Sequence, residues 1–156
     1  MMQYQFVTKW QITAPIEEVW DAISKPETWP SWWKSVEKVE LIRKGDKDGI
    51  GSVRKFVWKG RLPYKLIFEM QVTRVERPFV MEGLANGELS GSGIWTLEQR
   101  EESTSIRYDW RVRTTKWWMN LLAPVARPIF RWNHDYVMYQ GAVGLARHLN
   151  TRLINE

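Results

Sequence analysis

The chain has 156 residues, 44% of them hydrophobic, and a formal net charge of +5. It contains eleven tryptophans and no cysteine, which excludes disulfides, thiolate metal ligands and cysteine nucleophiles. The length suits one domain over residues 1–156. Neither a secretion signal in residues 1–10 nor an apolar run of bilayer-spanning length is present. We therefore expect a soluble, cytoplasmic protein, with peripheral contact to a membrane left open, whose charge favours anionic partners.

The first segment, residues 3–13, alternates between apolar and polar side chains, and this period of two predicts a half-buried strand. Its apolar side carries Tyr4, Phe6, Trp10 and Ile12. Pro15 then opens a short helix whose first turn holds acidic residues, as the positive end of a helix favours. Pro26 ends that helix, and residues 27–35 are predicted to form a second short helix or turn.

From residue 36 the period of two recurs in six further segments that are separated by turn signals. The predicted strands cover residues 36–43, 51–58, 64–75, 79–85, 89–98 and 104–113. Short turns between consecutive strands, such as Asn86-Gly87, make the sheet antiparallel. Several strands have one apolar face only, so one face of the sheet must be covered.

The last quarter of the chain, residues 118–153, has the period of an amphipathic helix. Its apolar stripe consists of Leu122, Val125, Ile129, Trp132, Tyr136, Tyr139, Val143 and Ala146. Because Pro124 and Pro128 lack backbone donors, we expect kinked or separate first turns and a continuous helix over residues 128–150. We expect the stripe to face the sheet. The predicted fold is α+β: a curved antiparallel sheet of about seven strands wrapped around a long C-terminal helix, with two short helices after strand 1.

Two pairs of glycines interrupt these patterns. Gly91 and Gly93 lie inside a predicted strand, whereas Gly141 and Gly144 lie in the long helix. Glycine inside a strand marks a bend or a close approach of another backbone. Either the helix packs closely against the strand at these glycines, which we favour, or the four together leave space for a ligand.

The segment APIEEVWDAI at residues 14–23, followed by WPSWW at residues 29–33, resembles the opening of the START-like superfamily, also called polyketide cyclase/dehydrase and lipid transport (SRPBCC). The order of elements resembles the helix-grip fold of that superfamily over the whole chain. The resemblance implies an apolar cavity between the sheet and the C-terminal helix. It implies no shared catalytic residue, because the superfamily includes lipid carriers, aromatic polyketide cyclases, quinone-binding proteins and relatives of pollen allergens.

The many aromatic rings on inward-facing positions either line such a cavity or form an ordinary core. Trp132 and Tyr136 on the long helix belong to the same aromatic set. The residues that we expect to contact a ligand are Trp33, Trp58, Phe68, Met81, Trp95, Tyr108, Trp110, Asn133, His134 and Val137. Asn133 and His134 would orient the ligand.

His134 is the candidate catalytic residue, because an ordinary histidine pKa of about 6.5 suits proton transfer near neutrality. The alternative, which we favour, is a histidine at the helix border that bonds a carbonyl or a strand side chain, since no catalytic partner can be located. His148 lies too far along the helix to share one ion with His134. We expect neither a metal site nor a cofactor.

The junction before the long helix, residues 116–124, contains the adjacent Trp117 and Trp118, which point to different sides of any regular element. Together with Leu121 and nearby basic side chains, they fit peripheral contact with an acidic membrane. The alternative, slightly favoured, is a lid folded over the core. The basic residues are dispersed and form no recognisable motif, so we expect no nucleic-acid partner.

These observations favour a protein that binds, transports or senses a hydrophobic small molecule, such as a lipid, a quinone or a polyketide-like aromatic, in a cavity between the sheet and the C-terminal helix. One alternative is a cyclase or dehydratase that holds a reactive chain in the same cavity and moves a proton with His134. A second alternative is a membrane-surface-associated protein with a filled core.

Overall fold

The computed structural model describes residues 3–154, and its elements follow the predicted order. They are β1 (Gln3–Ile12), α1 (Ile16–Ile23), a 3₁₀ turn (Pro26–Thr28), α2 (Trp29–Trp32), β2 (Val36–Arg43), β3 (Val53–Trp58), β4 (Leu66–Glu76), β5 (Val80–Gly87), β6 (Leu89–Gln99), β7 (Thr104–Thr114), α3 (Trp117–Leu121) and α4 (Ala123–His148). Every predicted strand is present, with its ends close to those predicted from the alternation of side chains.

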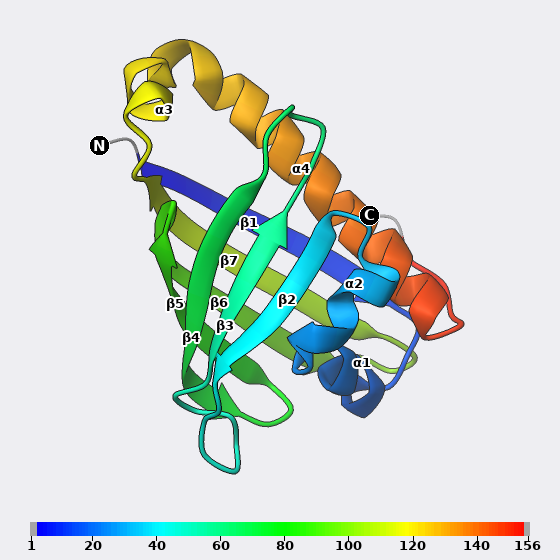
Figure 1. The fold of residues 1–156 in the computed structure, drawn as a ribbon. Helices are drawn as coiled ribbons and strands as arrows, with labels where there is room; N and C mark the ends of the chain where they lie inside the picture. Colours follow the sequence, from blue (N-terminus) through cyan, green and yellow to red (C-terminus); the bar gives the residue numbers. More distant parts are fainter. Residues whose placement is uncertain (1–2, 155–156) are drawn as a thin grey trace.

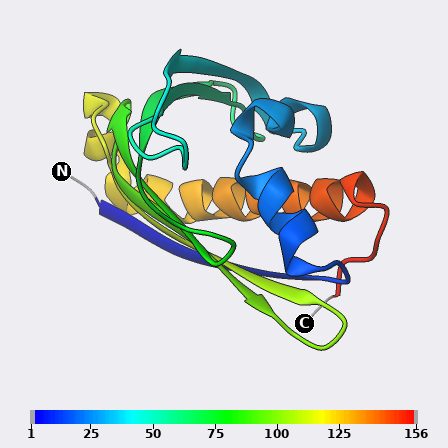
Figure 2. The same cartoon turned by 90° about the horizontal axis from the view of Figure 1, so that it is seen from below.

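The strands form one antiparallel sheet in which β1 pairs with the last strand and not with its neighbour in sequence. The order is β1-β7-β6-β5-β4-β3-β2. Strand β1 pairs with β7 along its whole length, from Gln3 opposite Arg113 to Ile12 opposite Thr104. The sheet curves strongly, and α4 lies across its open side, in contact with β1 and with α2 (Figures 1 and 2). The expected α+β architecture is confirmed.

Tryptophan rings fill part of the space between the sheet and α4. Trp10 from β1, Trp95 from β6, and Trp29 and Trp33 from the α2 region are all buried. The Trp33 ring meets Trp58 of β3 edge to face, with 4.9 Å between ring centroids and planes at 90°, an arrangement that the ring quadrupoles favour. This cluster therefore fixes α2 between the sheet and α4.

Helix α4 begins earlier than predicted, because Pro128 lies inside the helix and not at its start. Pro124 occupies the first turn, where a missing backbone donor breaks no helical hydrogen bond. Pro128 removes the hydrogen bond that would reach the Pro124 carbonyl. Both prolines are exposed, so water can bind that carbonyl. The separate helix α3 confirms the expected break before the long helix.

The predicted orientation of α4 is wrong over most of its length. Leu122, Val125, Ile129, Trp132 and Tyr139 of the predicted stripe are exposed, with Val125 reaching 74%. The buried face consists of Ala126, Val137, Met138, Gly141, Ala142, Gly144, Leu145 and Ala146. The concave sheet already supplies bulky inward aromatics, so it accepts the helix face that has the smaller side chains. Periodicity alone selected the other face because large apolar residues also recur there at helical spacing.

The two glycines of α4 allow close approach of α2 and not of β6, which corrects the favoured expectation. A Cβ at Gly144 would lie 1.8 Å from the Trp32 carbonyl oxygen, and one at Gly141 would lie 2.4 Å from the Trp33 ring. On β6, a Cβ at Gly93 would lie 2.3 Å from the hydroxyl of Tyr108. Gly93 therefore makes room for a neighbouring side chain that faces the inside of the sheet.

Candidate ligand-binding cavity

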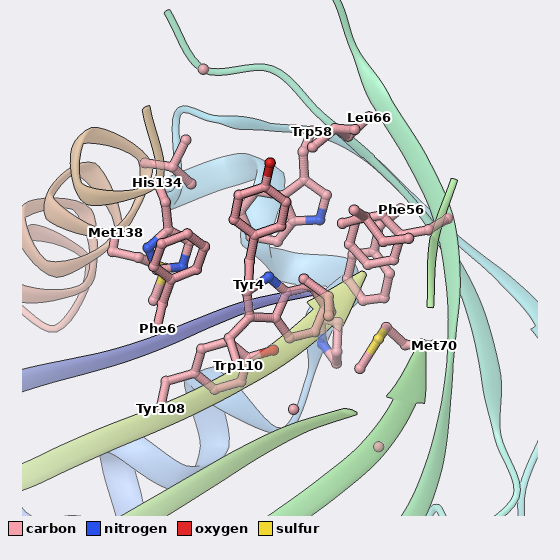
Figure 3. Close-up of a pocket in the computed structure, with 18 of the residues that line it drawn as sticks. Tyr4, Phe6, Phe56, Trp58, Leu66, Met70, Tyr108, Trp110, His134 and Met138 are labelled. Atoms are coloured by element: carbon pink, nitrogen blue, oxygen red, sulfur yellow. The ribbon is translucent and has the colours of Figure 1, made fainter. Parts of the chain in front are cut away.

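A cavity lies between the inner face of the sheet and α4. Inward-facing side chains of β1 and of β3 to β7 form most of its wall, and one face of α4 forms the rest (Figure 3). The residues labelled in Figure 3 are Tyr4, Phe6, Phe56, Trp58, Leu66, Met70, Tyr108, Trp110, His134 and Met138. The space open to the centre of a water-sized sphere is about 170 Å³, whereas one water molecule needs about 10–15 Å³ on that measure. The cavity is therefore much larger than a packing defect.

Flat ring faces make up much of the cavity wall. The rings of Trp95 and Tyr108 lie 4.2 Å apart at 31°, and those of Phe6 and His134 lie 4.1 Å apart at 15°. Phe68 packs on Trp110 at 5.8 Å. Ring surfaces of this kind contact planar or extended apolar molecules over a large area.

His134 is held in its neutral form by its surroundings. Burial, and to a smaller extent the nearby positive charge of Arg131, lower the pKa of its imidazole from 6.5 to about 4. The buried Nδ1 atom has no hydrogen-bond partner among the residues that the structure describes, and the carboxylate of Asp135 lies 3.9 Å away, beyond hydrogen-bond distance. At neutral pH His134 is therefore an uncharged group whose free nitrogen lies in the cavity wall.

The tyrosines of the cavity are also neutral. Burial raises the pKa of Tyr108 and of Tyr4, and it raises the pKa of Tyr64 to about 12, with smaller effects from Tyr4 and Glu88. Tyr64, in the loop between β3 and β4, packs edge to face on Trp118 of α3 at 5.5 Å. These phenols can donate hydrogen bonds but do not supply negative charge near pH 7.

The structure places most of the predicted contact residues around the cavity. Those in the wall are Trp58, Phe68, Met81, Trp95, Tyr108, Trp110, Asn133, His134 and Val137. Trp33 is not in the wall: it lies in the tryptophan cluster, and its Nε1 donates to the Val137 carbonyl at 2.9 Å. Asn133 also holds a loop, because its Oδ1 accepts from the backbone N–H of Arg61 at 2.7 Å.

Trp132 and Tyr136, which the sequence placed in the same aromatic set, lie outside the cavity. The guanidinium group of Arg61 stacks over both rings, 5.3 Å from the centroid of Trp132 and 4.2 Å from that of Tyr136. Trp132 is 50% exposed. Both residues lie outside the cavity because α4 turns a different face toward the sheet from the one that we predicted.

Several wall residues were missed by the sequence reasoning. They include Tyr4, Phe6, Phe56, Leu66, Met70, Leu89, Met119, Phe130 and Met138. Tyr4 and Phe6 were predicted to face inward with Trp10, and alternation alone does not distinguish the part of a strand beside a cavity from the part beside packed core. Phe130 and Met138 were missed because they lie on the helix face that we predicted to be exposed.

The described residues offer no cluster of three or more histidine and acidic side chains that could hold a metal ion. The polar groups of the cavity are mostly neutral and act as single hydrogen-bond donors or acceptors. The arrangement can enclose an apolar molecule and fix its orientation through a few polar atoms.

Comparison with known proteins agrees with this geometry. The family described as polyketide cyclase / dehydrase and lipid transport matches residues 3–149. No curated protein matches the chain significantly. Solved structures with a similar fold include the Zhui aromatase/cyclase from Streptomyces sp. R1128, with a TM-score of 0.74, 12% identity, and coverage of 96% of this chain and 94% of that one.

Two further structures show how widely the fold occurs. A START superfamily protein from Mycobacterium smegmatis has a TM-score of 0.76 and 13% identity, and covers 94% of this chain and 97% of its own. Ginseng major latex-like protein 151 from Panax ginseng has a TM-score of 0.71 and 9% identity, with 96% and 99% covered. At these identities the likeness concerns the helix-grip fold alone. The match to the family described above spans residues 3–149, nearly the whole sequence. The chain therefore belongs to the polyketide cyclase / dehydrase and lipid transport family.

Proposed function

We propose that the protein binds a hydrophobic small molecule, such as a lipid, a quinone or a polyketide-like aromatic, in the cavity between the sheet and α4. The observation that carries the proposal is a cavity of about 170 Å³ walled by aromatic rings. Burial of a ligand there removes apolar surface from water on both partners, which supplies the driving force for binding. Family membership supports a ligand-binding or cyclase-like role in general terms.

The test is native mass spectrometry of the protein purified from its own source, followed by organic extraction. A stoichiometric apolar molecule is the expected result. Val137→Trp adds a ring to the cavity wall and should abolish its uptake, whereas Ile129→Trp, on the exposed face of the same helix, should not. An empty protein that also fails to bind a panel of lipids, quinones and aromatics would overturn the proposal.

A cyclase or dehydratase reaction in the same cavity is the second candidate. The supporting observation is that His134 and Tyr4 both place a buried, unpaired polar atom in the wall. With a pKa lowered to about 4, His134 is a weak base at neutral pH and serves a carbonyl better as a hydrogen-bond donor. His134→Ala should then abolish turnover of a poly-β-keto thioester while retaining its binding. Equal turnover by the variant would exclude this role.

We further propose that the outer face of α3 and α4 contacts an anionic membrane surface, which extends the contact predicted for Trp117, Trp118 and Leu121. Trp117 and Leu121 are 74% and 70% exposed, and Trp118 is half-buried against Tyr64. The exposed apolar stripe of α4 continues from this point along the helix. Such a stripe suits burial at the boundary between headgroups and acyl chains.

The charges beside the stripe favour acidic lipids over a second protein copy. Arg127 and Arg131 are exposed on the side of α4 next to β1, and Arg61 lies over Trp132 on the other side. Asp135 is the one acidic residue of α4, and it is exposed, so the net charge of these four side chains is positive. Basic groups that flank an apolar stripe place positive charge at the depth of anionic headgroups. No helix in residues 3–154 is long and apolar enough to cross a bilayer, so the contact would be peripheral.

Vesicle sedimentation tests this contact. The protein should bind phosphatidylglycerol vesicles and bind phosphatidylcholine vesicles much more weakly, and a Trp117→Ala/Leu121→Ala double variant should lose the binding. Leu84→Ala on β5, which removes an apolar side chain that is 52% exposed on the sheet, is the control and should keep it. The proposal would be overturned if the double variant and Leu84→Ala bound the vesicles equally. It would also be overturned if the protein formed a concentration-dependent dimer and did not bind vesicles.

A further inference from the structure

Three polar atoms of residues in the cavity wall are buried and have no hydrogen-bond partner within residues 3–154. They are the hydroxyl of Tyr4, the indole Nε1 of Trp58 and Nδ1 of His134. Buried polar atoms are nearly always hydrogen-bonded, and each exception calls for an explanation. A fourth atom of this kind, Nε1 of Trp32, belongs to a residue outside the wall. The other three belong to side chains that line the cavity.

The three side chains come from different elements but surround one part of the cavity. Tyr4 stacks beside Phe6 on β1 at 6.1 Å, and Phe6 stacks on His134 of α4 at 4.1 Å. Figure 3 shows Tyr4, Trp58 and His134 around the same part of the wall, with the hydroxyl of Tyr4 directed away from β1. The unpaired atoms therefore belong to one part of a wall that is mostly apolar but also includes Arg54, Gln71, Glu82 and Asn133.

The chemistry of these atoms defines the group that would satisfy them. An indole N–H donates only, a phenol donates or accepts, and each nitrogen of a neutral imidazole does one or the other. Burial keeps Tyr4 and His134 uncharged near pH 7. At least one ligand atom must accept a hydrogen bond, and an oxygen with two lone pairs can accept from two of these donors at once.

A negatively charged ligand would find no available cation in this wall. Arg54 is the one lysine or arginine among the described residues that line the cavity, and its Nε donates to Glu27 at 2.9 Å. Arg127 and Arg131 are exposed and lie outside the wall, with their guanidinium groups over the rings of Tyr4 and Phe6. A ligand carboxylate buried here would therefore lack a compensating positive charge. A neutral oxygen needs no such charge.

On the basis of the proposed function, we infer that the ligand is a neutral, ring-containing molecule with a carbonyl or phenolic oxygen, and that this oxygen accepts hydrogen bonds from Tyr4 and Trp58 beside His134. The flat faces of Trp95, Tyr108 and the other wall rings contact the body of the ligand. The inference selects ketones, quinones and phenols over fatty acids and over pure hydrocarbons.

The test compares three ligands built on one ring system by isothermal titration calorimetry with the full chain. Acetylnaphthalene carries a neutral carbonyl, ethylnaphthalene has nearly the same shape without the oxygen, and naphthoate carries a negative charge. The wild type should bind acetylnaphthalene about threefold to tenfold more tightly than ethylnaphthalene, the range expected for a neutral hydrogen bond, and should bind naphthoate most weakly.

Variants locate the effect in the wall. Tyr4→Phe and Trp58→Phe should each reduce the preference for acetylnaphthalene over ethylnaphthalene, whereas Trp32→Phe, which removes an unpaired indole N–H outside the wall, should leave it unchanged. Equal affinity of the wild type for the first two ligands, or tighter binding of naphthoate, would overturn the inference while leaving a hydrophobic binding site intact. Failure of all three ligands to bind would overturn this inference, and the proposed function would fall with it only if the panel of lipids and quinones also failed to bind.

Discussion

The neutral state of His134 makes the stability of the fold depend on pH. Burial holds the imidazole pKa at about 4 in the folded chain, against 6.5 when the side chain is in water. Below pH 6.5 the unfolded chain therefore binds a proton that the folded chain does not, so the free energy of unfolding falls as the pH falls. The loss approaches about 1.4 kcal/mol per pH unit, reaches about 2 kcal/mol near pH 5, and levels off below about pH 4.

The assay is urea unfolding of the wild type and of His134→Leu at a series of pH values from neutral to mildly acidic. The two proteins share every carboxylate, so the difference between their free energies of unfolding isolates the histidine. That difference should be constant above about pH 7 and should move by about 2 kcal/mol against the wild type near pH 5. A difference that does not change with pH would show that the folded protein accepts the proton at His134 freely, and would refute the argument from burial.

Three further substitutions test the packing around α4. Gly144→Ala places a Cβ against the backbone carbonyl of Trp32 and should lower the free energy of unfolding by about 1–3 kcal/mol or more in chemical denaturation. Asn133→Ala removes the hydrogen bond to the backbone N–H of Arg61 and should cost about 1 kcal/mol, with faster amide exchange confined to the β3–β4 loop. Trp33→Phe removes the indole donor to a buried carbonyl of α4 and should lower the melting temperature without abolishing ligand binding, because the ring lies outside the cavity wall. Destabilisation below 0.5 kcal/mol by Gly144→Ala, unchanged loop exchange, or loss of binding by Trp33→Phe would contradict these assignments.

The sheet could be predicted closely from the sequence because alternation reports a local property. On β7, the buried Ile106, Trp110 and Val112 alternate with exposed arginines, so the pattern identifies both the strand and its inward face. The α4 face could not be predicted in this way. Both faces of that helix carry apolar residues, and the choice between them depends on the curvature of the sheet and on the approach of α2 at Gly141 and Gly144.

The cavity illustrates the same limit at the level of single residues. Inward-facing aromatics such as Trp58 and Trp110 could be recognised from the alternation of side chains. Alternation could not show which of them line the cavity, because a cavity wall and a packed core use the same residue types. Trp33 has the same character, yet a hydrogen bond to α4 places it in the core. The polar atoms that distinguish the cavity belong to Tyr4, Trp58 and His134, and their lack of partners is visible only after the chain has folded.

The tryptophan cluster behind the cavity has an optical consequence. Trp10, Trp29, Trp33, Trp58 and Trp95 form a connected set with ring centroids 4.9–6.3 Å apart. Indoles at such separations exchange excitation energy, so light absorbed by one is emitted or quenched through its neighbours. Three members of the set, Trp29, Trp58 and Trp95, also line the cavity, and a bound quinone or ketone there would quench emission from indoles that it never touches. The native tryptophan emission would thus report whether the proposed ligand occupies the cavity, without an added label.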